Sequence, residues 1–310
     1  MSAALILDAC LVLLVLAVAV WTIAARETFP AIAGFVSYGL LLAIVWVRLS
    51  SVDVALTEAA IGGGATGVLL LGAAARLTDR AGRRPAGIGL RIMAGALCLA
   101  ITAALAFVIL TLPDPAPTLA PQAVAGLPAT GVGNPITAVL VAYRGIDTLL
   151  EKIVLLLAVI GVWCLTPDDS WGALPAPWGT ARQDGAIVLL ARLLAPVGVV
   201  VGVYIVWVGA DDPGGAFQGG TILAAMWLLA MMAGLITPPP ATSRRLRRVL
   251  VAGPALFLVV AFAGFAMSGD FLSYPPAYAK WLIKLIEAAL TLSIAAMVGV
   301  LVIGPAVRKR

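Results

Sequence analysis

Long apolar stretches, separated by short polar connections, dominate this 310-residue sequence. A helix needs about 20 mostly apolar residues to cross the hydrocarbon of a bilayer, and we count nine such stretches. We therefore predict an all-α, polytopic transmembrane bundle of about nine spans. The predicted spans are residues 3–23, 29–47, 52–71, 88–112, 148–165, 186–208, 216–236, 249–267 and 281–303.

The composition agrees with a membrane protein and excludes several kinds of site. Hydrophobic residues make up 62% of the chain and charged residues 11%, against about 45–50% and 25% in soluble domains. There is no histidine, and the three cysteines lie in apolar runs without the CxxC spacing of metal or cluster ligands. No glycine-rich phosphate-binding motif is present. We expect no metal site, no cofactor and none of the enzyme classes that depend on them.

The distribution of Lys and Arg predicts the orientation. Cytoplasmic connections carry an excess of basic residues, and nine spans place the three basic clusters of this chain on one side. The N-terminus should then lie outside and the C-terminus in the cytoplasm. The same clusters account for the net charge of +5, so we expect no nucleic-acid partner. The clusters are Arg76, Arg80, Arg83 and Arg84; Arg244, Arg245, Arg247 and Arg248; and Arg308, Lys309 and Arg310.

Four acidic side chains lie inside predicted spans, near their outer ends. A charge at mid-membrane costs at least about 2.5–3.5 kcal/mol on insertion scales, so each needs an explanation. Their similar depth favours a cation-attracting vestibule at the outer face. The alternative is that each reaches the interface or pairs with Arg48, Lys152 or Lys284. The four are Asp8, Glu58, Glu151 and Glu287.

Spacing along the predicted helices suggests local partners for the charged residues. Lys284 and Glu287 are three residues apart on one helix face and could pair. Asp147 and Glu151 are four apart and share a face, whereas Lys152 follows directly and should point elsewhere.

Two further patterns concern the third span and the long connection. The sequence Ser50-Ser51-Val52-Asp53 predicts a capping box that opens the third span, and Gly62, Gly63, Gly64 and Gly67 predict close helix packing. After a loop over residues 113–133, residues 134–144 predict a short helix at the membrane interface.

A glycine-rich stretch connects the sixth and seventh predicted spans. Asp211-Asp212-Pro213-Gly214-Gly215 predicts a tight turn, followed by a glycine-softened helix start. Irregular backbone at membrane depth persists only where it is buried or lines a watery cavity. The stretch resembles the signature of the MnhB family, the B subunit of Mrp-type multisubunit cation/proton antiporters, close to Gly-His-Asn-x-Pro-Gly-Gly-Gly-Phe-x-Gly-Gly. The matching positions are Gly209, Pro213, Gly214, Gly215, Phe217, Gly219 and Gly220.

This resemblance covers about residues 186–306 and departs from the pattern at three positions. Ala210 replaces the histidine, Asp211 the asparagine and Ala216 one glycine. Any role of that histidine is therefore absent from this chain.

Two more segments resemble parts of the same assemblies. Residues 52–59 are similar to Pro-Asp-Val-Ala-Leu-Thr-Glu-Ala of the MbhD-like segment of the antiporter A subunit, with Val52 replacing the proline. Asp8 falls where that segment has an acid in its first helix. Residues 133–151 resemble the MbhE-like pattern Asn-Val-Val-Asn…Phe-Arg-Gly-Phe-Asp-Thr-Leu-Gly-Glu, with Leu150 replacing the last glycine.

Together the resemblances imply three segments: residues 1–85 (MbhD-like), 86–184 (MbhE-like) and 185–310 (MnhB-like). They imply an accessory subunit of a Mrp-like antiporter in the cell inner (plasma) membrane, working with other antiporter subunits on monovalent cations and protons. The large proton-translocating part of the A subunit is not matched, so we expect no pumping by this chain alone. Candidate ion ligands or proton relays are Glu58, Asp53, Asp147, Glu151, Glu287 and Asp8, with Lys152, Lys284 and Arg144 as charge partners.

Two alternatives remain at this point. The same segments occur in membrane-bound hydrogenases and other complex-I-related assemblies, where the chain would serve a redox-driven ion pump. The other alternative is a purely structural scaffold that holds antiporter subunits together.

Overall fold

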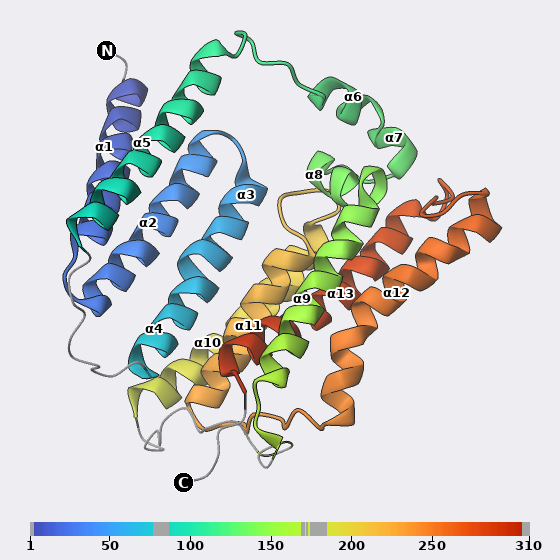
Figure 1. Cartoon of the computed structure of the whole chain (residues 1–310). Helices are drawn as coiled ribbons and strands as arrows, with labels where there is room; N and C mark the ends of the chain where they lie inside the picture. Colours follow the sequence, from blue (N-terminus) through green and yellow to red (C-terminus); the bar gives the residue numbers. More distant parts are fainter. Residues whose placement is uncertain (1–2, 77–86, 169–170, 172, 174–184, 306–310) are drawn as a thin grey trace.

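The computed structural model describes residues 3–76, 87–168, 171, 173 and 185–305, and the secondary structure of these residues is helical (Figure 1). The all-α prediction is thus confirmed over this part of the chain. The basic residues Arg80, Arg83, Arg84, Arg308, Lys309 and Arg310 lie outside the described residues.

The N-terminal helices form a layer of their own. Helix α1 (Ala3–Ala24) packs against α2 (Thr28–Arg48), and α2 packs against a third helix made of α3 (Val52–Thr57), the π-helix η1 (Glu58–Ala65) and α4 (Thr66–Arg76). Glycines allow α2 and η1 to pack closely, as predicted. A Cβ on Gly39 of α2 would lie 2.7 Å from the backbone N of Gly63 in η1, so only glycine fits at position 39. The π-helical turn follows directly after the segment that carries Asp53.

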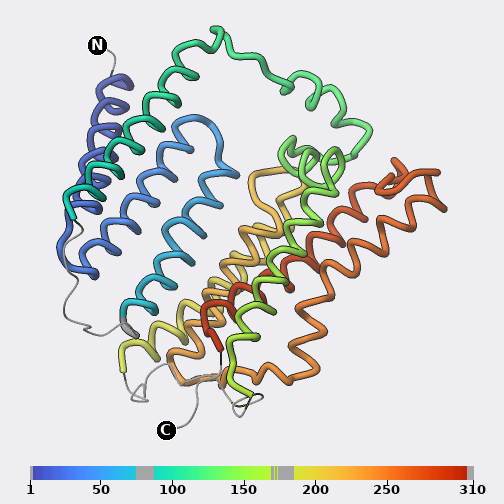
Figure 2. The backbone as a smooth tube through the Cα atoms, in the orientation of Figure 1, coloured from blue at the N-terminus to red at the C-terminus, as the bar shows by residue number. Residues whose placement is uncertain are grey.

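The middle of the chain connects the two halves of the molecule. Helix α5 (Ile88–Thr111) has no buried residue, and its connection to α6 (Ala120–Ala125) and α7 (Leu127–Thr130) passes along one end of the molecule (Figure 2). The predicted short helix over residues 134–144 is present as α8 (Pro135–Thr137) and the π-helix η2 (Ala138–Tyr143). Helix α9 (Gly145–Cys164) follows after one sharp bend.

The C-terminal half is a bundle around one central helix. α13 (Ala279–Ile303) contacts α9, α10 (Ala186–Val208), α11 (Ala216–Met232) and α12 (Arg244–Ser268). Its side chains Ile283, Ile286 and Ile294 are fully buried with Phe257 of α12. α13 therefore forms the core against which the polar side chains described below are positioned.

Seven helices are long and apolar enough to cross a membrane among the residues described. The prediction of nine spans is therefore met only in part. α9 carries Asp147, Glu151 and Lys152 in its first half, and α11 is shorter than predicted because it ends at Met232, before a turn at Gly234 (φ +70°). Whether α9 and α11 span, and which side each end faces, stay predictions.

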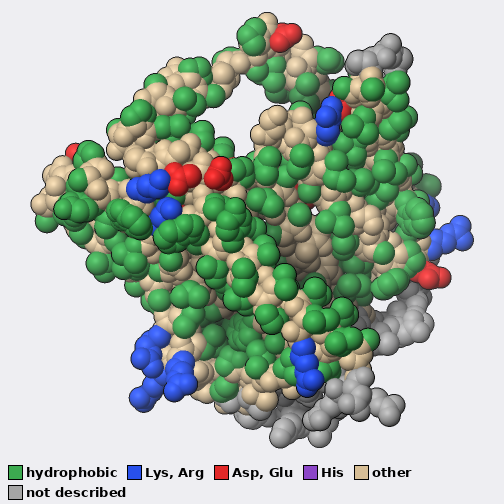
Figure 3. All heavy atoms as spheres, turned by 180° about the vertical axis from the view of Figure 1, so that it is seen from behind, with side chains coloured by type: hydrophobic (Ala, Val, Ile, Leu, Met, Phe, Trp, Pro, Cys, Tyr) green, Lys and Arg blue, Asp and Glu red, His purple; other side chains and the backbone are tan. Residues whose placement is uncertain are grey.

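The surface is largely apolar. Hydrophobic side chains cover most of the face in Figure 3, with small groups of basic and acidic side chains between them. α4 ends and α12 begins at the same end of the molecule (Figure 1), so Arg76 and the Arg244–Arg248 cluster lie at one end. A multi-pass membrane protein explains this surface, because lipid covers apolar side chains that water would not.

Candidate ion-pathway pocket

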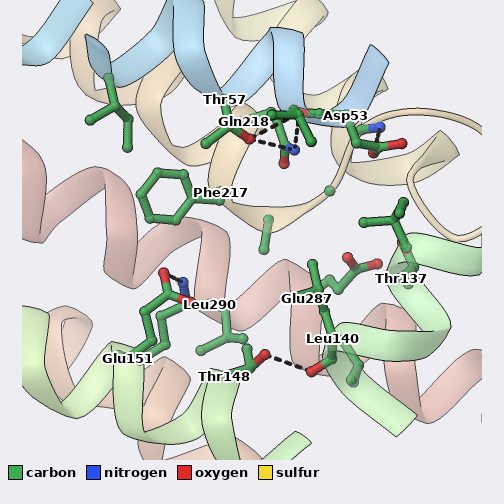
Figure 4. Close-up of a pocket in the computed structure, with 18 residues that line it drawn as sticks. Asp53, Thr57, Thr137, Leu140, Thr148, Glu151, Phe217, Gln218, Glu287 and Leu290 are labelled. Atoms are coloured by element: carbon green, nitrogen blue, oxygen red, sulfur yellow. Dashed lines mark hydrogen bonds and ion pairs between the residues drawn. The ribbon is translucent and has the colours of Figure 1, made fainter. Parts of the chain in front are cut away.

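A cavity of about 510 Å³ lies where the N-terminal layer meets the C-terminal bundle. Its walls come from α3, η1, α8, η2, α9, the turn before α11, α11 and α13, so all three predicted segments contribute (Figure 4). Four charged side chains line it: Asp53, Glu151, Lys152 and Glu287. All four were predicted from the sequence as pathway residues or charge partners.

Asp53 ties the N-terminal layer to the glycine-rich turn. Its Oδ1 accepts hydrogen bonds from the backbone N–H of Gly214 (2.9 Å) and from Nδ2 of Asn134 (3.4 Å). Gly214 has φ +156°, and a Cβ there would lie 2.4 Å from the carbonyl oxygen of Ile205. Glycine is thus required at the point where the turn meets the acid.

The capping-box prediction was wrong. Ser51 precedes α3 but its side chain makes no capping hydrogen bond; its Oγ donates instead to the Leu49 carbonyl at 3.4 Å. The Asp53 side chain is buried and accepts its hydrogen bond from the Gly214 N–H of the glycine-rich turn, rather than from an N–H of its own helix.

Asn134 is a second connection, and its contribution was missed by sequence reasoning. Its Nδ2 also donates to the carbonyls of Gly209 (3.2 Å) and Asp212 (3.0 Å), and its Oδ1 accepts from the Ile136 N–H as an N-cap. Thr137 Oγ1 donates to the same Gly209 carbonyl at 2.6 Å. The asparagine directly before Pro135 was a readable N-cap signal, but nothing local indicated its distant partners.

Gln218 was also missed. It is 8% exposed, and its Nε2 donates to Thr57 Oγ1 (3.1 Å) and to the Asp53 carbonyl (3.4 Å). A buried amide inside an apolar helix was the available signal, since such groups need partners.

Glu287 is the most deeply buried of the described acids. It is 4% exposed, and its Oε2 has no hydrogen-bond partner among the described residues. The backbone of the turn lies close to the other oxygen, since a Cβ on Gly215 would be 3.1 Å from Glu287 Oε1. The predicted pair with Lys284 is not formed: the Lys284 ammonium lies 4.4 Å from the centre of the Trp207 ring and 3.9 Å from Asp211 Oδ2. The turn, rather than the same helix, supplies the partner of Lys284.

Lys152 lies deep in the pocket and does not point away from Glu151 as predicted. It is 4% exposed, and its Nζ lies 2.7 Å from Glu151 Oε1 and 4.5 Å from the Phe217 ring centre. The Phe217 face and the Glu151 carboxylate together replace water around the ammonium.

Three predicted pathway acids lie outside this cavity. Asp8 pairs with Arg48 at 2.8 Å on the exposed face of α1 and α2, and Asp147 pairs with Arg144. Glu58 opens the π-helix η1, and its carboxylate lies against Gly62, where a Cβ would be 2.0 Å from Oε1.

Asp211 forms an ion pair at the start of the glycine-rich turn. Its Oδ1 accepts from Lys280 Nζ at 2.6 Å. The hydrogen bond from Lys280 holds the pKa of the Asp211 carboxyl below its ordinary value. This ion pair fastens the turn to the start of α13.

The cavity brings titratable and hydrogen-bonding side chains together. The described residues contain no group of three or more acidic or cysteine side chains placed to hold a metal ion. Carboxylates, hydroxyls and a buried ammonium in a partly apolar cavity instead resemble a relay of titratable groups.

Comparison with protein families assigns the two ends of the chain. Residues 186–307 match a family described as a domain related to the MnhB subunit of Na+/H+ antiporters, and residues 13–79 match the MbhD family of MBH subunits. The glycine-rich turn and Glu287 lie in the part that matches the MnhB-related family, and Asp53 lies in the part that matches the MbhD family.

Solved structures share this fold. A chain of the Mrp complex from Dietzia sp. DQ12-45-1b superposes with a TM-score of 0.77 and 24% identity, covering 97% of this chain and 35% of that one. A chain of the membrane-bound sulfane sulfur reductase, an archaeal respiratory membrane complex, gives 0.57 and 24%, covering 69% and 97%.

One curated relative adds a sequence match. An uncharacterized protein, MJ1307 of Methanocaldococcus jannaschii, is 27% identical over 158 residues. The match covers 46% of this chain and 60% of the relative, so this chain spans about three fifths of that protein.

Proposed function

We propose that this chain is an accessory membrane subunit of a Mrp-like monovalent cation/proton antiporter, and that its pocket forms part of the ion or proton route. The observation that carries the proposal is Glu287, a buried carboxylate whose Oε2 has no partner among the described residues although it lines a cavity. An uncompensated buried acid is costly, which favours a role in transport over one in stability.

The surrounding residues support a relay. Asp53 lines the cavity with Glu287, and Glu151 and Lys152 line it from α9. Titratable groups on several helices around one cavity are typical of proton and cation routes in membranes. Asp53 is heavily hydrogen-bonded, so it also holds the wall of this route in place.

A second host complex is supported by the other comparisons. The MbhD match and the likeness to a sulfane sulfur reductase chain favour a redox-driven, complex-I-related assembly as an alternative. In that host the same pocket would serve ion movement driven by electron transfer in other subunits.

The first experiment recovers the host complex. The tagged chain is purified from native membranes in mild detergent and its partners are identified by mass spectrometry. Large antiporter-like subunits without redox proteins support the antiporter; iron–sulfur or nickel–iron subunits support the redox-driven alternative. Recovery of neither kind of subunit argues against both.

The second experiment separates a route from a scaffold. Glu287→Gln keeps the size of the side chain and removes its charge, so an ion route loses exchange while the complex still assembles. A scaffold instead shows unchanged exchange, or lost assembly.

A further inference from the structure

A second groove, of about 410 Å³, opens on the outside of the bundle where α11 ends, α12 begins and α13 ends. Trp227 of α11 and Ala295 and Ala296 of α13 line it. Arg245 and Val249 line it from α12, where they are four residues apart on one face. Residues four apart on a helix lie roughly 6 Å apart along its axis, so the groove runs from a cation toward apolar side chains.

The apolar part of the groove is set by small residues and a fixed ring. A Cβ on Gly299 would lie 2.5 Å from the Trp227 ring, so this glycine allows the ring to approach α13 closely. The two alanines leave space beside the ring that larger side chains would fill. The shape suits a slender hydrocarbon rather than a bulky side-chain surface.

The basic end of the groove carries charge without compensation. Among the described residues, none of the four arginines at the start of α12 has an acidic partner. Arg247 is directed elsewhere, since its Nε donates to the Ala241 carbonyl (2.8 Å) and its guanidinium lies 6.0 Å from the Trp163 ring centre. Arg245 is exposed and makes no hydrogen bond or ion pair within the described part of the chain.

We propose that this groove binds one anionic phospholipid, with the phosphate on Arg245 and an acyl chain along Trp227, Val249 and the two alanines. A cation at the end of an apolar groove on a membrane-facing surface matches the two parts of such a lipid. Basic pockets between helices at the cytoplasmic side are a known form of acidic-lipid recognition, and the positive-inside rule expects this end of α12 on that side.

The test uses the purified full chain in a neutral detergent, titrated with phosphatidylglycerol or phosphatidylcholine and read by native mass spectrometry. We expect phosphatidylglycerol to bind several-fold more tightly than phosphatidylcholine. R245Q should weaken phosphatidylglycerol binding about fivefold, the effect of about 1 kcal/mol for one arginine near an anionic surface.

Two further variants distinguish a site from general charge attraction. R91Q removes one exposed arginine from α5, away from the groove, and should leave binding unchanged. A295L fills the apolar part with the arginines intact and should also weaken binding. The proposal is overturned by equal binding of both lipids, by an equal effect of R91Q and R245Q, or by unchanged binding in A295L.

R245K guards against a folding artefact. It keeps the charge, so it should retain most of the binding. If R245K melts like the wild type but loses as much binding as R245Q, a phosphate contact at Arg245 is contradicted. If a protein subunit stays on this face and no lipid binds, the groove is a subunit interface and the lipid proposal is wrong.

Discussion

The ammonium of Lys152 lies 4.5 Å from the centre of the Phe217 ring, in a pocket that leaves the lysine 4% exposed. The first residue belongs to α9 and the second to α11, so the contact joins two helices across the cavity. Because the lysine has lost nearly all of its water, the ring and Glu151 are its main compensation.

Removing the ring should therefore destabilise the chain. Phe217→Leu keeps the apolar volume in part but removes the π face, and a desolvated cation–π contact is worth about 2 kcal/mol. We expect a lower melting temperature of the purified chain in detergent. Phe217→Tyr keeps the face and serves as the control; equal melting of the leucine variant and the wild type would contradict a stabilising contact.

Asp53 should act through its acceptor oxygens more than through its charge. Asp53→Asn retains an oxygen for the Gly214 N–H and should melt close to the wild type. Asp53→Leu leaves that N–H buried without a partner, which costs about 1–3 kcal/mol. Thermal unfolding of both variants tests this; a large loss in the asparagine variant would show that the charge itself stabilises the fold.

Gly214→Ala should damage the turn. The new Cβ would lie 2.4 Å from the Ile205 carbonyl oxygen, at a φ of +156° that suits glycine. We expect a lower yield of folded chain and a lower melting temperature. Gly72→Ala is the matched control, because nothing lies within 4 Å of a Cβ at that position.

Glu287→Gln should reduce exchange strongly in the assembled complex, while assembly and melting stay close to the wild type.

The sequence also predicts that Glu58→Gln impairs exchange without stopping assembly. Cation-dependent proton movement in inverted membrane vesicles measures both. Wild-type exchange by one of these variants removes that residue from the route.

Acid should loosen the turn through Asp211. Its pKa is held below the ordinary value of 3.8 by the Lys280 hydrogen bond. A lowered folded-state pKa contributes stability that is present above the ordinary value and lost as the pH falls through the folded value. The melting temperatures of the wild type and Lys280→Gln should therefore differ at pH 6 and converge below about pH 4; a constant difference would contradict this role.

The sequence predicted the long helices well because apolar length alone determines them. Two of the nine predicted spans, α9 and α11, are not among the seven long apolar helices of the described residues. Charged residues lie in α9, and α11 ends before the turn at Gly234. The pairing of Lys284 was missed for a different reason. Helical spacing identifies neighbours on one helix, but Asp211 and Trp207 reach this lysine from a turn and from another helix.

The charged residues of the pocket were predicted one by one, but their meeting in one cavity was not predicted. Glu151, Lys152 and Glu287 were singled out for charge at membrane depth and Asp53 through the resemblance, but the sequence does not show which of these residues meet. Asp8 carried the same depth signal and pairs with Arg48 at the surface instead. Only tertiary contacts, such as those of Asn134, decide between these outcomes.

The bond between Asp53 and Gly214 joins positions 161 residues apart. Ribosomes add about 5–20 residues per second, so Asp53 is made on the order of ten seconds before the N–H that will bind it. During that interval the N-terminal layer holds the Asp53 carboxylate without the Gly214 N–H that will bind it. The order of synthesis therefore makes closure of the pocket a late step, completed only when the last helices enter the bilayer.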